Sequence, residues 1–277
     1  MTKSFTFDSP FGANAIFWLC GLQEDERGPT RRIVEDLQVQ GRLPIPVRQV
    51  DLNSPDDLTI AIQCLCSMAA REGGIRPIVH LDMHGSPSDG IKAGNGFLDW
   101  ESLGNALRDL NSTTGNKLLV VGGACHSLST IRSLDIHSAS PFYALIAPEG
   151  EILTGVLEEK VVPFYETLFK TGSLDQAAAQ LGQPFRYVHC EKVLFIILAR
   201  YIKNGLKGRT LEERRERLLT EVFLGHEDKT PDAIRRARAA IKDGLKPTQD
   251  LVNRYAGPFL CNRPCGFSIE DLLNMVS

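Results

Sequence analysis

Apolar and polar residues along the first two thirds of the chain follow a pattern typical of an α/β fold. Short apolar runs that end at glycine or at polar residues predict buried strands at 14–21, 45–52, 76–85, 116–127 and 140–153. Segments with helical spacing lie between and after them, at 29–40, 54–72, 100–111, 157–172 and 173–182. Strands that alternate with helices predict a mostly parallel central sheet covered by helices on both faces.

Local signals support two of these elements. Ser54, followed by a proline and two acids, predicts the N-cap of a helix. The dipeptide Asn95-Gly96 predicts a tight hairpin after the third long strand. We therefore expect a short antiparallel hairpin to interrupt the alternation of strands and helices.

The pattern changes beyond Pro184. Three segments, 187–208, 210–225 and 230–245, have helical spacing, and the last two have threonine or proline start signals and glycine near their ends. We therefore divide the chain into an α/β domain at 1–184 and a helical C-terminal extension at 185–277.

Composition narrows the classes of function. The chain has 277 residues, of which 43% are hydrophobic and 23% charged, and its formal net charge is −3. This charge argues against a protein that binds nucleic acid by broad phosphate neutralisation. The N-terminal stretch is interrupted by Asp8 and Pro10, which is unlike a signal peptide, and the apolar segment 193–199 is too short to cross a membrane. We expect a cytoplasmic protein that binds neither nucleic acid nor membranes.

The seven cysteines are an odd number in a sequence without a secretory signal, which predicts reduced thiols. Cys64 and Cys66 lie in a helical segment, where cysteine behaves as a small hydrophobic residue. Cys261 and Cys265 lie in a loop-like segment without a clear partner pair. The sequence therefore gives little support to a structural zinc site.

Two predicted strands end in residues suited to nucleophilic catalysis. The stretch "IVHLDMHG" ends at His84 and Gly85, and "LLVVGGAC" ends at Cys125 after small residues that allow a substrate to approach. If these two strands are neighbours, His84 reaches the same sheet edge as the cysteine. A cysteine nucleophile needs such a base, and the amide of Gly85 offers an oxyanion donor. The pattern predicts a Cys–His dyad.

The order of these motifs resembles the caspase-like cysteine peptidases, a group that includes caspases, metacaspases, separase, gingipain-type enzymes and bacterial CHAT domains. The resemblance covers residues 12–182, and the pair of helices at 157–182 resembles the end of a CHAT domain in particular. It implies a caspase-like three-layer α-β-α sandwich. By position, His84 matches the general base of the family, Cys125 its nucleophile, and Gly85 the glycine of the oxyanion site, which the amide of Cys125 completes.

The resemblance also implies an activity. The protein is expected to be a cysteine endopeptidase, a hydrolase that cleaves a protein substrate without a metal or an organic cofactor. Bacterial relatives are often regulated proteases in antiviral defence or cell death. A regulatory partner or activator is therefore expected in addition to the substrate, with the helical extension as a candidate surface for control.

Several charged residues are candidates for the pocket that binds the P1 side chain, the residue before the scissile bond. Asp82 is placed to line this pocket or to orient His84, and Glu149, Glu151 and the acids at 24–26 follow the ends of other strands. Metacaspases carry an acid two residues before the nucleophile, where this sequence has Gly123. A basic P1 residue is favoured, while arginines that follow the first strand would suit an acidic one: Arg27, Arg31 and Arg32.

Two alternatives stay open at the level of sequence. His80, Asp82 and His84 alternate along one strand and share a face, which suits a metallohydrolase with zinc or iron. The second alternative is a non-catalytic scaffold of the same fold that binds a partner through its helical extension. In the peptidase interpretation His80 is a core residue, and only His84 takes part in the chemistry.

Overall fold

The computed structural model describes residues 10–206, 208–224 and 230–276. The N-terminal stretch 1–9, part of the segment unlike a signal peptide, lies outside the described residues. A six-stranded sheet in the order β2-β1-β3-β7-β8-β9 forms the centre. Its strands are β1 (Ala15–Cys20), β2 (Val47–Asp51), β3 (Pro77–Asp82), β7 (Leu119–Gly122), β8 (Ala144–Pro148) and β9 (Phe185–His189).

All pairings in this sheet are parallel except the last, because β9 runs antiparallel to β8. The carboxyl ends of β1, β3, β7 and β8 therefore meet at one edge of the sheet. The third and fourth predicted strands are neighbours, as expected: β3 pairs with β7 over Ile78–Leu81 and Leu119–Gly122.

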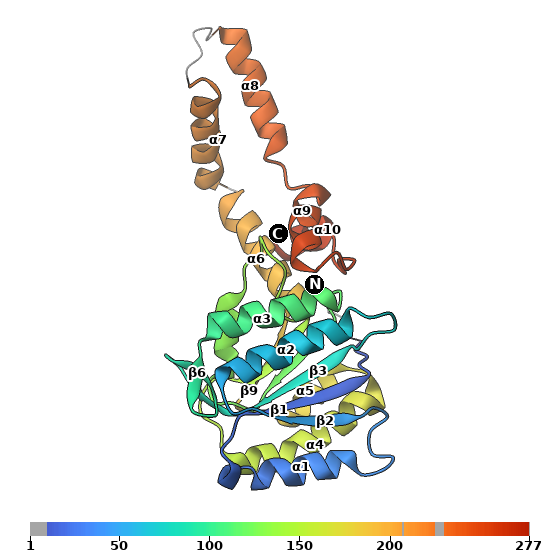
Figure 1. Cartoon of the computed structure of the whole chain (residues 1–277). Helices are drawn as coiled ribbons and strands as arrows, with labels where there is room; N and C mark the ends of the chain where they lie inside the picture. Colours follow the sequence, from blue (N-terminus) through green and yellow to red (C-terminus); the bar gives the residue numbers. More distant parts are fainter. Residues whose placement is uncertain (1–9, 207, 225–229, 277) are drawn as a thin grey trace.

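Helices cover both faces of the sheet and give a three-layer sandwich (Figure 1). On one face, α2 (Pro55–Ala69) and α3 (Trp100–Thr113) pack against the sheet. On the other lie α1 (Gly28–Gln38), α4 (Thr154–Thr171) and α5 (Leu174–Leu181). Ser54 caps α2 by accepting a hydrogen bond from the amide of Asp57 at 3.1 Å, as predicted, an interaction that stabilises a helix by about 1 kcal/mol.

A second, three-stranded antiparallel sheet follows β3. It consists of β4 (His84–Ser86), β5 (Gly90–Ala93) and β6 (Gly96–Leu98), in that order. The predicted hairpin is present, but Ala93 pairs with Gly96, so its two-residue loop is Gly94-Asn95 and not Asn95-Gly96. Gly94 has φ +56 and supplies the left-handed conformation that this turn needs.

The C-terminal third is more closely joined to the sandwich than the sequence suggested. Residues 185–189 form strand β9 of the main sheet, where the sequence pattern predicted a helix from residue 187. The helix α6 (Cys190–Gly205) follows directly, and its buried side chains belong to the same core as those of α1, α4 and α5. The predicted division at Pro184 therefore falls immediately before a strand of the main sheet.

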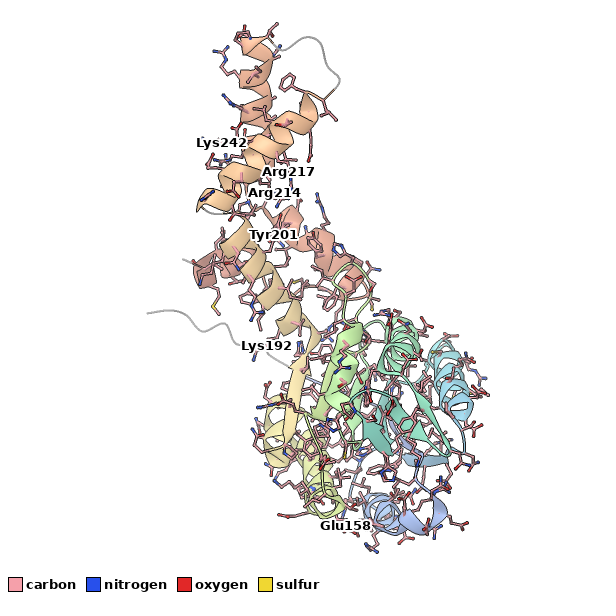
Figure 2. All side chains as sticks on the ribbon, turned by 90° about the vertical axis from the view of Figure 1, so that its left-hand side faces the viewer. Glu158, Lys192, Tyr201, Arg214, Arg217 and Lys242 are labelled. Carbon is pink, nitrogen blue, oxygen red and sulfur yellow. The ribbon has the colours of Figure 1, made fainter. Side chains whose placement is uncertain are left out.

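The last helices are α7 (Gly208–Val222), α8 (Pro231–Gly244), α9 (Gln249–Phe259) and α10 (Ile269–Val276). The pair α9 and α10 packs against α6, whereas α7 and α8 project from the body as a hairpin without buried side chains in the described residues (Figures 1 and 2). Within the described ranges, no helix is both long and apolar enough to span a bilayer.

Candidate active site

His84 is the first residue of β4 and is held by a carboxylate from another part of the sequence. Its Nε2 lies 2.9 Å from Oε1 of Glu26, in the short 3₁₀ helix Glu24–Glu26 that follows β1. The second oxygen of Glu26 accepts the backbone amide of Gln23 at 3.0 Å. This amide and His84 together lower the pKa of Glu26. An ionised carboxylate only accepts hydrogen bonds, so Nε2 of His84 is the donor in this contact.

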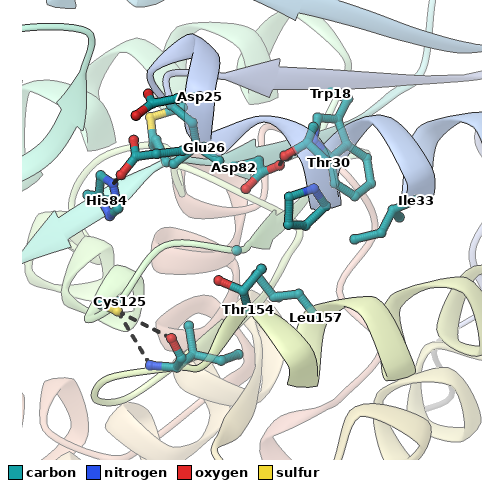
Figure 3. Close-up of a pocket in the computed structure, with 15 residues that line it drawn as sticks. Trp18, Asp25, Glu26, Thr30, Ile33, Asp82, His84, Cys125, Thr154 and Leu157 are labelled. Carbon is teal, nitrogen blue, oxygen red and sulfur yellow. Dashed lines mark hydrogen bonds and ion pairs between the residues drawn. The ribbon is translucent and has the colours of Figure 1, made fainter.

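Cys125 lies in the turn that follows β7, and its side chain is half-buried. The thiol contacts the backbone of Ile152, in the loop after β8: the amide of Ile152 donates to Sγ at 3.4 Å, and Sγ lies 3.9 Å from its carbonyl oxygen (Figure 3). The same loop is joined to the turn that carries Cys125 by a hydrogen bond from the amide of His126 to the carbonyl of Gly150, at 3.0 Å.

Close packing between the backbones of Gly85 and Cys125 places His84 and Cys125 in the same region. The backbone of Gly85 lies directly on that of Cys125, so closely that a Cβ atom on Gly85 would overlap the Cys125 carbonyl oxygen. The amide of Gly123 also donates to the carbonyl of Leu81 at 2.7 Å, which extends the pairing of β3 with β7 to the site. Only glycine fits at residue 85. Among the described residues, no backbone hydrogen bond uses the amide of Cys125, so this amide is free for a ligand.

His84 and Cys125 line one pocket with a volume of ≈ 380 Å³. Asp82 lies within it, with 6% of its surface exposed. Its Oδ2 accepts hydrogen bonds from Trp18 Nε1 at 2.8 Å and from Thr30 Oγ1 at 2.5 Å. Burial raises the pKa of Asp82, while the two donors and nearby His84 oppose the rise. Asp82 is therefore a buried acid in the pocket, and among the described residues no lysine or arginine forms an ion pair with it.

The other charged groups of the pocket are also acidic. Asp25 and Glu26 line it beside His84, and the described residues that line it include no lysine or arginine. Figure 3 shows Asp25, Glu26 and Asp82 along one side and Thr154 and Leu157, from the start of α4, along the other. A pocket with this charge suits a basic side chain.

The structure does not bring His80, Asp82 and His84 together as metal ligands. His80 is buried, stacks on Trp18 with ring centroids 3.6 Å apart, and its Nδ1 lies 2.9 Å from the hydroxyl of Tyr165. Burial lowers its pKa to about 3. Within the described ranges, no group of three or more His, Cys, Asp or Glu side chains is arranged to hold a metal ion. Neither cysteine pair, Cys64/Cys66 or Cys261/Cys265, is therefore part of such a group.

The two glutamates after β8 do not line the pocket. Glu149 forms an ion pair with Arg186 of β9, with its Oε2 3.0 Å from Nε, and Glu151 is exposed. The arginines that would favour an acidic P1 residue are also outside the pocket lining. Their ion pairs lie elsewhere: Arg27 with Asp51, Arg31 with Glu24 and Arg32 with Glu158.

Glu26 has a role that the sequence did not reveal. It was one of three consecutive acids considered for the P1 pocket, and its contact with His84 spans 58 residues of sequence. The one local signal is the pairing of Gln23 with Glu26 in a capping box, which fixes the carboxylate in space. That signal gives no indication of the partner.

Comparison with known proteins adds no relative. No protein-family model matches the sequence, and no curated protein matches it. The fold and the geometry of the pocket therefore carry the functional interpretation.

Proposed function

We propose that this protein is a cysteine endopeptidase of the caspase-like kind, with Cys125 as nucleophile and His84 as general base. The observation that carries the proposal is the meeting of these two residues in one pocket, through contact between the backbones of Gly85 and Cys125. A cysteine, a histidine base and a carboxylate that orients the base are the parts needed for nucleophilic attack on an amide.

The mechanism follows from the hydrogen bonds. Glu26 accepts the proton of Nε2, so Nδ1 of His84 takes the proton from the thiol of Cys125. The sulfur attacks the scissile carbonyl, and the amides of Gly85 and Cys125 are the proposed donors to the oxyanion. His84 then returns the proton to the leaving amine, and water hydrolyses the acyl-enzyme. The contact of Sγ with Ile152 must loosen when the thiol turns to the substrate.

The acidic pocket indicates the substrate class. A lysine or arginine at P1 would place its charge beside Asp82, a buried acid whose two hydrogen-bond donors, Trp18 and Thr30, are both neutral. An ion pair there is screened less than one at the surface. We therefore include cleavage after basic residues in the proposal. The regulated role that the resemblance implies is also part of it, with the projecting α7–α8 hairpin as the surface for a partner.

Intact mass after treatment with peptide acyloxymethyl ketones tests this proposal. Reagents with arginine, aspartate or leucine at P1 are applied to the wild type and to Cys125→Ala, His84→Ala and Asp82→Asn. We expect one adduct, fastest with arginine, that requires both Cys125 and His84. Asp82→Asn should reduce the preference for arginine over leucine by about tenfold or more.

The outcomes separate the alternatives. An adduct that persists in Cys125→Ala contradicts the assigned nucleophile, and the absence of any adduct in the wild type favours the scaffold interpretation. Equal labelling by all three reagents, unaffected by Asp82→Asn, would leave the nucleophile in place and refute the assignment of the P1 pocket.

A further inference from the structure

The small sheet β4–β6 extends the active site on the side of His84. Its strand pairings place His84 opposite Lys92, and Lys92 opposite Phe97. Side chains of directly paired residues project from the same face of a sheet. We call this row of three residues, His84, Lys92 and Phe97, the β4–β6 platform, and it begins at the proposed catalytic base.

The two faces of this sheet differ strongly in burial. The alternate residues Ile91 and Ala93 are fully buried against the core below α2 and α3. On the platform, Phe97 is 46% exposed, which is high for an aromatic side chain. Lys92 takes part in no ion pair of the described residues, although it lies close enough to Glu26 to help lower the pKa of that carboxyl. The platform thus offers an unpaired cation and an open aromatic ring beside the catalytic base.

The proposed chemistry decides which part of a substrate passes over this face. His84 protonates the leaving amine, so the amine and the substrate residues that follow it must lie on the His84 side of the site. Paired side chains on adjacent strands are about 5 Å apart, so Phe97 is roughly 10 Å from His84 along the row. An extended peptide advances about 3.3 Å per residue. Phe97 is therefore placed to contact about the third substrate residue after the scissile bond, and Lys92 the first or second.

We propose that the β4–β6 platform binds the substrate segment that immediately follows the scissile bond, and that Lys92 and Phe97 determine which residues are preferred in that segment. Lys92 selects an acidic side chain one or two residues beyond the cleaved bond, and Phe97 selects an apolar side chain about three residues beyond it. The proposal rests on the proposed peptidase function. Its occupant is a peptide because the platform is continuous with the catalytic pocket through His84.

Cleavage of a library of proteome-derived peptides by the full-length protein, read by mass spectrometry, tests the platform. The variants are Lys92→Glu and Phe97→Ala. The matched controls are Lys170→Glu, an exposed lysine at the end of α4, and Ile60→Ala, an exposed apolar residue on α2. Residue preferences are recorded separately on each side of the cleaved bond.

We expect Lys92→Glu to reverse the charge preference at the first or second position after the bond, by about two- to fivefold, the size of an exposed ion pair. Phe97→Ala should remove the apolar preference near the third position, by about fivefold. Neither change should alter the P1 preference, and the controls should match the wild type. The charge reversal is a gain of selectivity that a merely misfolded variant cannot produce.

Two contrary results have different meanings. Cleavage after basic residues with a profile beyond the bond that neither variant changes would refute the platform and leave the peptidase standing. Absence of any cleavage that depends on Cys125 would refute the peptidase function, and the platform with it.

Discussion

The contact between Gly85 and the backbone of Cys125 makes Gly85→Ala a sensitive test of how the proposed site is assembled. The added methyl group would overlap the carbonyl oxygen of Cys125, far inside the 3.0 Å that real Cβ contacts respect. Relief of this overlap requires the two strand ends to separate by roughly 1 Å, and a displacement of that size costs a catalytic site about 100-fold in rate. We expect kcat/KM for an arginine-containing peptide to fall by about 100-fold.

Gly155→Ala is the control for this prediction. Gly155 lies in the first turn of α4, close to the pocket, but a Cβ atom there would meet no atom within 4 Å. Both variants are compared with the wild type by peptide cleavage, by alkylation of Cys125 with iodoacetamide, and by thermal unfolding. At alkaline pH iodoacetamide needs only an accessible thiolate and no oxyanion site, so its reaction should persist in Gly85→Ala. A folded Gly85→Ala variant that cleaves at the wild-type rate would refute the proposed assembly.

Three further predictions concern other parts of the molecule. Glu26→Gln can present its amide to His84 and favour the wrong tautomer, so it should lower kcat about 10- to 100-fold with little change in KM. Glu24→Gln, two residues away and exposed, should leave kcat unchanged. Equal effects of the two substitutions would contradict an orienting role for Glu26. Burial holds the pKa of His80 at about 3, below its ordinary 6.5. As the pH falls, His80 therefore binds a proton in the unfolded state before it does so in the folded state. The free energy of unfolding should drop by about 3 kcal/mol between about pH 7.5 and 4.5. In urea titrations His80→Phe should lose this part of the pH dependence, and an unchanged profile would show that His80 is not the group responsible. Truncation after Pro184 removes β9 and α6, so the product should lack a cooperative unfolding transition. A stable, active product would show that the α/β sandwich does not depend on β9 and α6.

Much of the sandwich could be predicted because each element carries its own signal. Strand β1 is a continuous apolar run, and α2 begins at a capping serine. The neighbouring positions of β3 and β7 followed from the general tendency of consecutive strands to pair. His84 and Cys125 could be predicted to lie close together on this basis, because residues at the ends of adjacent parallel strands converge, and both line the same pocket.

The remaining features depend on contacts distant in sequence. The partner of His84 is Glu26, and although a capping box with Gln23 distinguishes this acid from Glu24, nothing in the local pattern indicates that it reaches His84. Strand β9 was interpreted as the start of a helix because its residues run without a break into the apolar segment of α6, and the pairing with β8 alone defines it. Glu149 was expected at the pocket, but Arg186 from the same strand pairs with it on the surface.

The direct connection of β9 to α6 has a mechanical consequence. Near the start of β9, Arg186 pairs with Glu149, and the carbonyl of Pro184 accepts the amide of Glu149 at 3.4 Å. This is the loop whose Ile152 backbone contacts the thiol of Cys125. No linker separates β9 from α6, which is about 24 Å long. A displacement of α6 would therefore act directly on β9, and through β9 on the loop that contacts Cys125.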